Sequence, residues 1–180
     1  MDRTRQAMGE ILIYLFVVFL ITGGVLAFSY VPSGETVGYT GSYEPLRGTP
    51  MSAAYDSILD ISMDVRGGLF LRQIHQHCAV LLGLGAVVWA LLGRFRYALA
   101  VLGLAAVAAL GGYGSADDLL SGTFLARVPI PVWYGLHLVA ALAVGAVLVV
   151  SSRREAARQP RTAGLMAVTL GLTAMLIFLV

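Results

Sequence analysis

Charged side chains are scarce in this sequence. Of its 180 residues only 12% are charged, whereas 58% are hydrophobic, and the mean hydropathy is +0.83. A water-soluble domain of this size needs about twice as much charge to cover its surface, so lipid is the predicted solvent for most of the chain. The single cysteine, Cys78, excludes a disulfide framework, a zinc site of paired thiols and attachment of a cofactor through two cysteines. Lysine is absent, so all 12 basic residues are arginines.

Long apolar runs are the main feature that the sequence does have. A helix of about 20 apolar residues spans the hydrocarbon core. Five runs approach that length: 9–28, 69–92, 97–112, 132–151 and 162–180. The first run has no small-residue cleavage site, so we expect a retained helix rather than a signal peptide. The pattern predicts an all-α, polytopic membrane protein with five transmembrane helices.

The arginines set an expected orientation, because arginine gathers on the cytoplasmic side of membrane proteins. Eight of them flank the runs on one side: Arg3, Arg5, Arg94, Arg96, Arg153, Arg154, Arg158 and Arg161. The other four lie on the opposite side, where seven acidic residues offset their charge. We therefore expect a bacterial cytoplasmic membrane protein with its N-terminus in the cytoplasm and its C-terminus outside.

The polar segment 29–68 joins the first two runs on the expected outer side. It is too long for a turn, which makes it a candidate functional surface. Within it, apolar residues recur at helical spacing from Ala54 to Val65. This spacing predicts a short amphipathic helix over 52–65 that lies at the membrane interface.

Three histidines are present: His75, His77 and His137. Ligating side chains are costly to insert into a membrane helix, so each is a functional candidate. His75 and His137 are expected at the same depth, about 8 Å below the outer surface, on helices that run in parallel. Two such imidazoles suit the two axial positions of a haem iron. The alternative is that each only hydrogen-bonds a neighbouring helix, and the spacing alone leaves both open.

His77 lies two residues beyond His75, so it projects to nearly the opposite side of its helix. We therefore do not expect it to bind the same iron. A hydrogen bond between helices, or a place near the outer headgroups, is the expected role.

Several short segments resemble cytochrome b and cytochrome b6. They are Tyr30-Val-Pro-Ser33, Ala54-Tyr-Asp-Ser-Ile58, Asp64-Val-Arg-Gly-Gly68 with the following Leu69-Phe-Leu-Arg-Gln-Ile-His75, and Tyr134-Gly-Leu-His137. The resemblance covers roughly residues 9–151. It implies a four-helix haem-binding bundle over 1–151, with 29–68 as its outer loop. Residues 152–180 then add an arginine-rich cytoplasmic loop and a fifth transmembrane helix.

The resemblance also implies which residues form the site. His75 and His137 fall at positions of the iron ligands. Arg72 falls at an arginine of the family and is expected to offset the charge of a haem propionate.

Two glycines complete the implied site. Gly23 and Gly112 match positions where the family packs haem against bare backbone. A flat cofactor approaches a helix closely only where no side chain intervenes, so both are expected to face the haem. The alternative is that they ease helix packing, as glycine often does in membranes.

The departures from the family pattern are equally specific. The family binds a second haem through histidines about fourteen residues further along the same two helices. Here those positions hold Trp89 and Val150 or Ser151, so one haem b, near the outer face, is implied. The propionate-binding arginine before the second ligand is replaced by Val132, and the C-terminal half of the family has no counterpart in the sequence.

These expectations together give a function. We expect a membrane b-type cytochrome subunit that transfers electrons through one bis-histidine haem, within a quinol-linked respiratory or photosynthetic complex. Expected partners are other membrane subunits, a quinone or quinol, an outer-side cytochrome or iron–sulfur protein, and the lipid bilayer, but not nucleic acid. The chain is expected to be an electron-transfer subunit rather than a complete enzyme.

The sequence also allows two alternative functions to be considered for this chain. The first is a haem-free structural subunit that keeps the fold and binds quinone, lipid or neighbouring helices. The second, a transporter or channel, is disfavoured because no carboxylate lies at mid-membrane and no helix has a breaking Pro/Gly pair.

Overall fold

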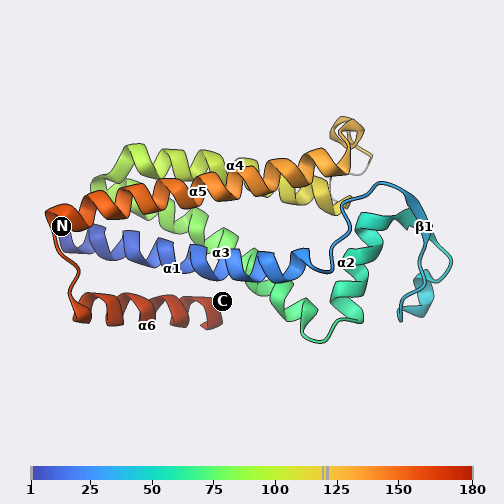
Figure 1. The fold of residues 1–180 in the computed structure, drawn as a ribbon, viewed down its shortest axis with the longest axis horizontal. Helices are drawn as coiled ribbons and strands as arrows, with labels where there is room; N and C mark the ends of the chain where they lie inside the picture. Colours follow the sequence, from blue (N-terminus) through green and yellow to red (C-terminus); the bar gives the residue numbers. More distant parts are fainter. Residues whose placement is uncertain (1, 119, 121, 180) are drawn as a thin grey trace.

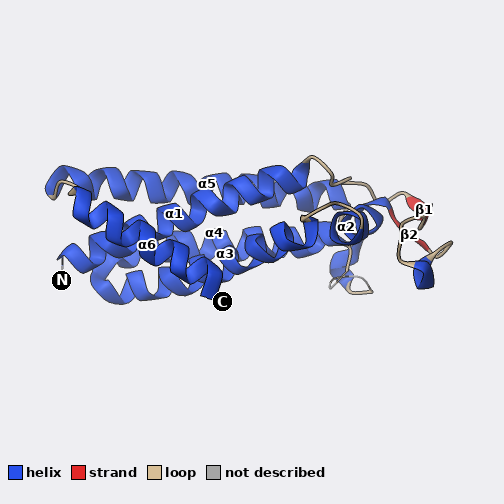
Figure 2. Cartoon of the chain, turned by 90° about the horizontal axis from the view of Figure 1, so that it is seen from below, coloured by secondary structure: helices blue, strands red, loops and turns tan. Residues whose placement is uncertain are grey.

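A computed structural model describes residues 2–118, 120 and 122–179. Most of the described chain is helical, and its long helices form one elongated bundle (Figure 1). The helices are α1 (Asp2–Ala27), α2 (Ala53–Met63), α3 (Gly68–Trp89), α4 (Phe95–Ala116), α5 (Ile130–Arg158) and α6 (Ala163–Leu179). Short single turns occur at η1 (Glu44–Leu46), η2 (Ala90–Arg94) and η3 (Phe124–Arg127). Two strands, β1 (Thr36–Gly38) and β2 (Pro50–Ser52), form a small hairpin at one end (Figure 2).

Three continuous helical segments of the described chain are long and apolar enough to cross a membrane: Asp2–Ala27, Gly68–Ala116 and Ile130–Arg158. The second of these has 49 residues and comprises α3, η2 and α4. The shorter α6 has 17 residues and lies beside α1 (Figure 1). The predicted all-α, multi-pass membrane fold is therefore confirmed. The predicted end of the fifth run, Val180, lies outside the described residues.

The chain reverses direction between α3 and α4 without a polar loop. Gly93 has φ +92° inside the wide turn η2, a conformation that costs glycine little because it has no Cβ. Figure 1 shows α3 and α4 running in opposite directions from this turn. The 49-residue segment therefore supplies two passes of the bundle.

Helix boundaries extend beyond the predicted runs at three places. Helix α1 begins at Asp2, seven residues before the run 9–28, and α4 extends the run 97–112 at both ends to 22 residues. The fourth run was predicted to end at Ser151, yet α5 continues for another seven residues to Arg158. Arg153, Arg154 and Arg158 therefore lie on a helix instead of in a loop, because this polar segment keeps its helical hydrogen bonds beyond the apolar run.

The bundle core lies between α1, α3 and α5. Leu12 and Leu15 of α1 and Cys78 of α3 are almost fully buried in it, as is Leu148 of α5. Large apolar side chains on the outer faces of the long helices are exposed instead. Apolar side chains thus occupy both the core and the outer faces of the bundle. A bilayer favours this distribution, since lipid tails need no polar cover.

The outer loop contains the predicted short helix, α2. Its N-terminus is capped by Ser52, whose Oγ accepts a hydrogen bond from the Tyr55 amide at 3.2 Å. Helix α2 meets the start of α3 closely, because a Cβ on Gly68 would overlap the carbonyl oxygen of Ile61. The contact fixes where α3 begins and therefore the height of the residues that follow it.

Candidate functional site

His75 projects from α3 against α1. Its Nδ1 lies 3.1 Å from the carbonyl oxygen of Phe19 and 3.2 Å from Oγ1 of Thr22. Because a carbonyl only accepts hydrogen bonds, Nδ1 carries the proton and donates it. The lone pair of the neutral ring is then on Nε2, the nitrogen that is free to bind a metal.

His137 on α5 is held in the same way by α4. Its Nδ1 lies 2.7 Å from the carbonyl oxygen of Ala108, so this ring also donates from Nδ1. Metal-binding histidines commonly donate their second ring N–H to a backbone carbonyl, which fixes the tautomer and the orientation of the ring. Both histidines therefore have the hydrogen bond that a ligand requires.

The two imidazoles lie close together inside the bundle. Their ring centres are 6.1 Å apart and the ring planes are inclined by 59°. With a metal–nitrogen bond of about 2 Å, two imidazoles on opposite sides of one metal ion have ring centres about 6 Å apart. The separation therefore suits two axial ligands of one iron. No group of three or more His, Cys, Asp or Glu that could hold a metal ion was found within the described part of the chain.

An aromatic side chain that sequence reasoning missed covers one side of the pair. Phe19 stacks on His75 with ring centres 4.1 Å apart and an angle of 13°, and its ring centre is 6.4 Å from that of His137. Phe19 precedes Gly23 by four residues, so helical spacing puts both on one face of α1. The four-residue spacing from Gly23 was the sequence signal that could have identified Phe19 as part of the site.

Gly23 and Gly112 lie against the imidazoles themselves. A Cβ at Gly23 would be 2.7 Å from Cε1 of His75, which is too close, and a Cβ at Gly112 would be 3.2 Å from Nδ1 of His137. The expectation was that these glycines face a flat cofactor. In the structure the bare backbone makes room for the two rings, and direct contact with a cofactor stays a prediction.

Comparison with known proteins identifies the family. No protein-family model matches the chain. The "Cytochrome bc1 complex cytochrome b subunit" of Mycobacterium tuberculosis (strain ATCC 25618 / H37Rv) is 43% identical over 145 residues, covering 73% of this chain and 26% of the relative. That of Streptomyces coelicolor is 41% identical over 136 residues, covering 68% and 25%, and that of Corynebacterium efficiens is 38% identical over 146 residues, covering 73% and 26%. The chain belongs to the cytochrome b family.

The family resemblance inferred from the motifs is thus confirmed. The chain spans about a quarter of the length of the curated relatives it matches.

In this member of the cytochrome b family, Arg72 lies one turn before His75. Its guanidinium is half-buried and donates from Nη1 to Oγ of Ser62 on α2. The structure therefore shows Arg72 tying the outer loop to α3, and binding of a propionate stays a prediction. His77 is partly buried, and none of the hydrogen bonds or ring contacts found among the described residues involves it.

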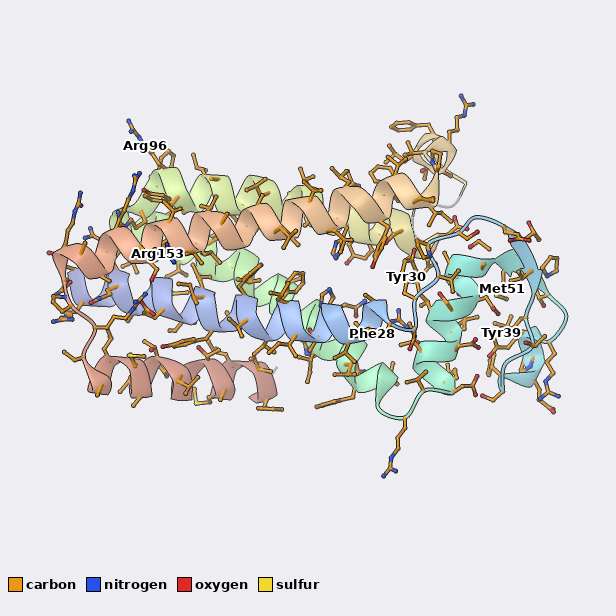
Figure 3. All side chains as sticks on the ribbon, viewed as in Figure 1. Phe28, Tyr30, Tyr39, Met51, Arg96 and Arg153 are labelled. Atoms are coloured by element: carbon orange, nitrogen blue, oxygen red, sulfur yellow. The ribbon has the colours of Figure 1, made fainter. Side chains whose placement is uncertain are left out.

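Tyr30 joins the outer loop to α4 and to α5, the helix that contains His137. Its hydroxyl donates to the carbonyl oxygen of Ser115 at 2.6 Å, and its ring lies 5.1 Å from that of Tyr134 (Figure 3). Burial raises the pKa of Tyr30 to about 12, because the charged phenolate would lose its water. The loop is therefore fixed to the outer end by a neutral, hydrogen-bonded side chain.

The outer loop also carries the acidic residues of α2. Burial and the neighbouring carboxylates of Asp56 and Asp64 raise the pKa of Asp60. Hydrogen bonding from the side chain and the backbone amide of Ser42 lowers the pKa of the Asp64 carboxyl. Asp64 is exposed, whereas Asp56 and Asp60 are half-buried at this end of the molecule.

The inner end of the same helices is filled. Trp89 is 2% exposed and lies against Gly9, where an added Cβ would be 3.5 Å from Cζ2 of the indole. Ser151 is fully buried, while Val150 is exposed. Of these two candidates for the position about fourteen residues beyond His137, Ser151 therefore faces inward. Trp89 Nε1 and Ser151 Oγ have no hydrogen-bond partner among the described residues. The indole fills the space between α3 and α1 at this level of the bundle.

Proposed function

We propose that this chain is a membrane b-type cytochrome subunit that holds one haem b near its outer face, with His75 and His137 as the iron ligands. The observation that carries the proposal is the matched hydrogen bonding of the two rings. Each donates its Nδ1 proton to a carbonyl of a neighbouring helix, at 3.1 and 2.7 Å, and each therefore presents Nε2 as the ligating atom.

The residues around the site prepare it for electron transfer. When bound, haem supplies a one-electron redox centre. His75 and His137 would together hold the iron and leave no coordination site open, which would favour electron transfer over oxygen chemistry. Phe19 and the apolar core keep water away from the rings, and Arg72 is the nearest cation proposed to offset a propionate.

A single haem is proposed because the inner positions cannot provide ligands. An indole nitrogen has no lone pair to offer a metal, and the Trp89 ring fills the space against Gly9. Ser151, the facing residue on α5, carries a hydroxyl instead of an imidazole.

The relatives are named as subunits of a cytochrome bc1 complex, and this chain matches about a quarter of each. We therefore propose that it exchanges electrons with a quinol, or with a cytochrome or iron–sulfur protein on the outer side, as part of a larger respiratory complex. It would be an electron-transfer subunit, and further membrane subunits would complete the enzyme. The arginines at one end of the bundle support an orientation with the N-terminus in the bacterial cytoplasm.

One observation favours the haem-free alternative, a structural subunit with this fold. The Nδ1 bonds already satisfy one polar group of each imidazole, as expected for histidines that only link helices. The two proposals differ in what Nε2 does, so a test must detect a ligand there.

The test is a dithionite-reduced minus oxidised visible spectrum of the protein purified in mild detergent, with haem quantified as pyridine haemochrome. We expect a sharp b-type α-band and about one haem per chain. His75→Ala and His137→Ala should each abolish the band, whereas His77→Ala, the matched control two residues away, should keep it. Wild-type protein that contains no haem would support the structural subunit, and loss of haem in the His77 variant alone would overturn the ligand assignment.

A further inference from the structure

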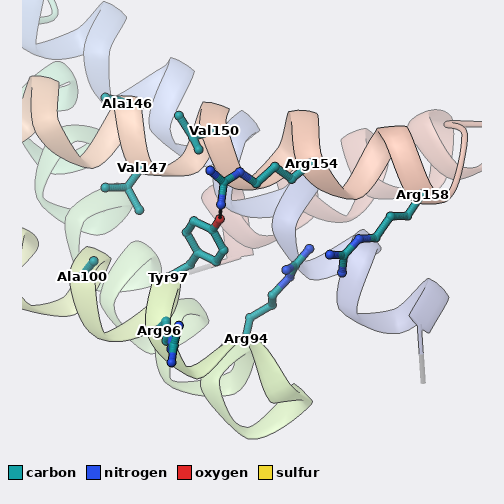
Figure 4. Close-up of a pocket in the computed structure, with 9 residues that line it drawn as sticks. All are labelled: Arg94, Arg96, Tyr97, Ala100, Ala146, Val147, Val150, Arg154 and Arg158. Carbon is teal, nitrogen blue, oxygen red and sulfur yellow. Dashed lines mark hydrogen bonds between the residues drawn. The ribbon is translucent and has the colours of Figure 1, made fainter.

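A cleft of about 650 Å³ opens between α4 and α5 at the inner end of the bundle (Figure 4). This end is opposite to the histidine pair, so the cleft is separate from the proposed haem site. It is lined by Arg94, Arg96, Tyr97, Ala100, Ala146, Val147, Val150, Arg154 and Arg158. Four of these nine residues are arginines and none is acidic.

The arginines come from two parts of the chain. Arg154 and Arg158 are one turn apart on α5, and both are exposed. Arg94 is at the turn that precedes α4, and Figure 4 shows its side chain extending toward that of Arg158. Like charges gathered at one opening repel each other, and an anion bound between them would relieve that repulsion.

The nearest carboxylate pairs with only one arginine of the cleft. Glu155 of α5 is buried, and it pairs with Arg94 and, at 3.2 Å, with Arg5. One carboxylate is thus shared by two guanidinium groups, and no ion pair of Arg96, Arg154 or Arg158 was found with a described residue. The cleft retains a net positive charge.

The rest of the cleft is apolar and lies toward the centre of the bundle. Ala100, Ala146 and Val150 are small, exposed side chains on facing helices, next to Val147. At the boundary between the two zones, Arg154 donates from Nη1 to the hydroxyl of Tyr97 at 2.7 Å, which holds this guanidinium over the cleft. The arrangement combines cations at the membrane surface with an apolar groove that continues toward the bilayer core.

We propose that this cleft binds one anionic phospholipid, with the headgroup phosphate between the exposed guanidinium groups of Arg154 and Arg158 and an acyl chain along the groove between α4 and α5. Arginine forms paired, charge-assisted hydrogen bonds with phosphate oxygens. Basic pockets between membrane helices on the cytoplasmic side are suited to such headgroups. A free phosphate ion would use the arginines but would leave the groove uncovered.

The test is native mass spectrometry of the full chain released from micelles that contain added phosphatidylglycerol, with phosphatidylcholine as the neutral lipid. We expect one phosphatidylglycerol to be retained per chain at low lipid concentration. The double variant Arg154→Gln/Arg158→Gln should weaken retention by roughly 25-fold, at about fivefold per arginine near the membrane surface. Arg153→Gln is the matched control, because it removes the same charge from the same turn of α5 but does not line the cleft.

Four outcomes would overturn the proposal. They are equal retention of phosphatidylcholine, an equal loss of retention in the Arg153 variant, displacement of the lipid by millimolar inorganic phosphate, and unchanged retention in the double variant. A circular dichroism spectrum of each variant shows whether it folds, and Arg154→Lys/Arg158→Lys should recover part of the affinity because the charge is restored.

Discussion

The two ends of the bundle repeat one packing arrangement with different side chains. Near the outer end, Gly23 of α1 lies against the ring of His75 on α3. Fourteen residues earlier on α1 and fourteen later on α3, Gly9 lies against the ring of Trp89. The same two helices therefore place a glycine against a ring at two levels, but only the outer ring has a nitrogen that can bind a metal.

The partner helices differ between the ends in the same way. At the outer level α5 provides His137 and α4 provides Gly112. Fourteen residues along, α5 provides Ser151 and α4 provides Ala98, both fully buried. The two levels of the bundle therefore have the same helix spacing, but one contains imidazole rings and the other contains ordinary core side chains. What changes is the side chain that fills the space.

The two ends are also held together by different forces. At the inner end, Glu10 accepts from Arg161 at 2.7 Å and from Ser152 at 3.1 Å, while Glu155 pairs with Arg5 and Arg94. At the outer end, neutral hydrogen bonds and stacked rings join the elements, such as Tyr30 with Ser115 and Tyr134. The inner end is thus stabilised by charge, and the outer end is kept neutral around the histidines.

The largest expected effect separates stability from haem binding. Trp89→Ala should lower the free energy of unfolding by about 3–5 kcal/mol, because it leaves a large hole in the core. The haem-to-protein ratio of the folded fraction should stay unchanged, since the indole belongs to the filled end. Unfolding in detergent mixtures, followed by circular dichroism, gives the first value, and pyridine haemochrome gives the second. Val88→Ala, at an exposed neighbour, is the control. A fall in haem content to half would contradict the one-haem proposal.

The ion network at the inner end gives the next largest effect. Glu155→Gln leaves two arginines without their carboxylate in a partly buried place, so we expect a loss of about 3 kcal/mol. Glu44→Gln removes an exposed pair with Arg47 and should change stability by less than about 0.5 kcal/mol. The same unfolding measurement compares the two. An equal effect of both variants would show that charge does not hold the inner end together.

Adjacent glycines on α1 allow a sharper test of the outer end. Gly23→Ala would place a methyl group 2.7 Å from Cε1 of His75, whereas at Gly24 an added Cβ meets nothing within 4 Å. We expect the first variant to lose about 1–3 kcal/mol and much of its haem, because the ring must move. Gly24→Ala should be neutral or slightly stabilising. Thermal unfolding and the haem spectrum measure both, and equal haem content in the two variants would remove the proposed role of Gly23.

The smallest expected effect concerns Tyr30 and pH. Tyr30→Phe removes one hydrogen bond and should cost about 1 kcal/mol at neutral pH. Tyrosine in the unfolded chain has a pKa of about 10, whereas burial raises the pKa of Tyr30 to about 12 in the folded state. Between these values the unfolded chain has lost the proton that the folded chain keeps, so stability falls as pH rises. The Phe variant should show a shallower fall above pH 10, and an identical slope would contradict burial of the neutral phenol.

Much of the fold follows from the sequence because lipid imposes simple rules on length and polarity. The runs at 9–28, 69–92 and 132–151 all lie within long helices, and equal depth on parallel helices places His75 and His137 at one level. That Trp89 stands where the family has a second ligand was inferred from the resemblance, and it stays a prediction. Whether the two histidines bind iron stays a prediction.

The details around the rings could not be predicted. The acceptors of both Nδ1 protons are backbone carbonyls, at Phe19 and Ala108, and a carbonyl is present at every residue and carries no sequence signal. The apolar pattern of the α2 segment comprised Ala54, Ile58, Ile61 and Val65. Of these, Ala54 and Ile61 are buried, whereas Ile58 is half-buried, Val65 is exposed and the polar Ser57 is buried instead. Ser57 turns inward because its Oγ accepts a hydrogen bond from the Val31 amide, a contact that only the folded loop creates.

The wide turn η2, which contains Gly93, affects how the chain enters the bilayer. Helices α3 and α4 are joined by η2 without a stretch of water-bound peptide between them. The pair can therefore leave the aqueous phase as one hairpin, with its backbone hydrogen bonds already made. Only the far ends of that hairpin then need to cross the lipid, and the arginines beside the turn stay at the membrane surface from which the hairpin enters.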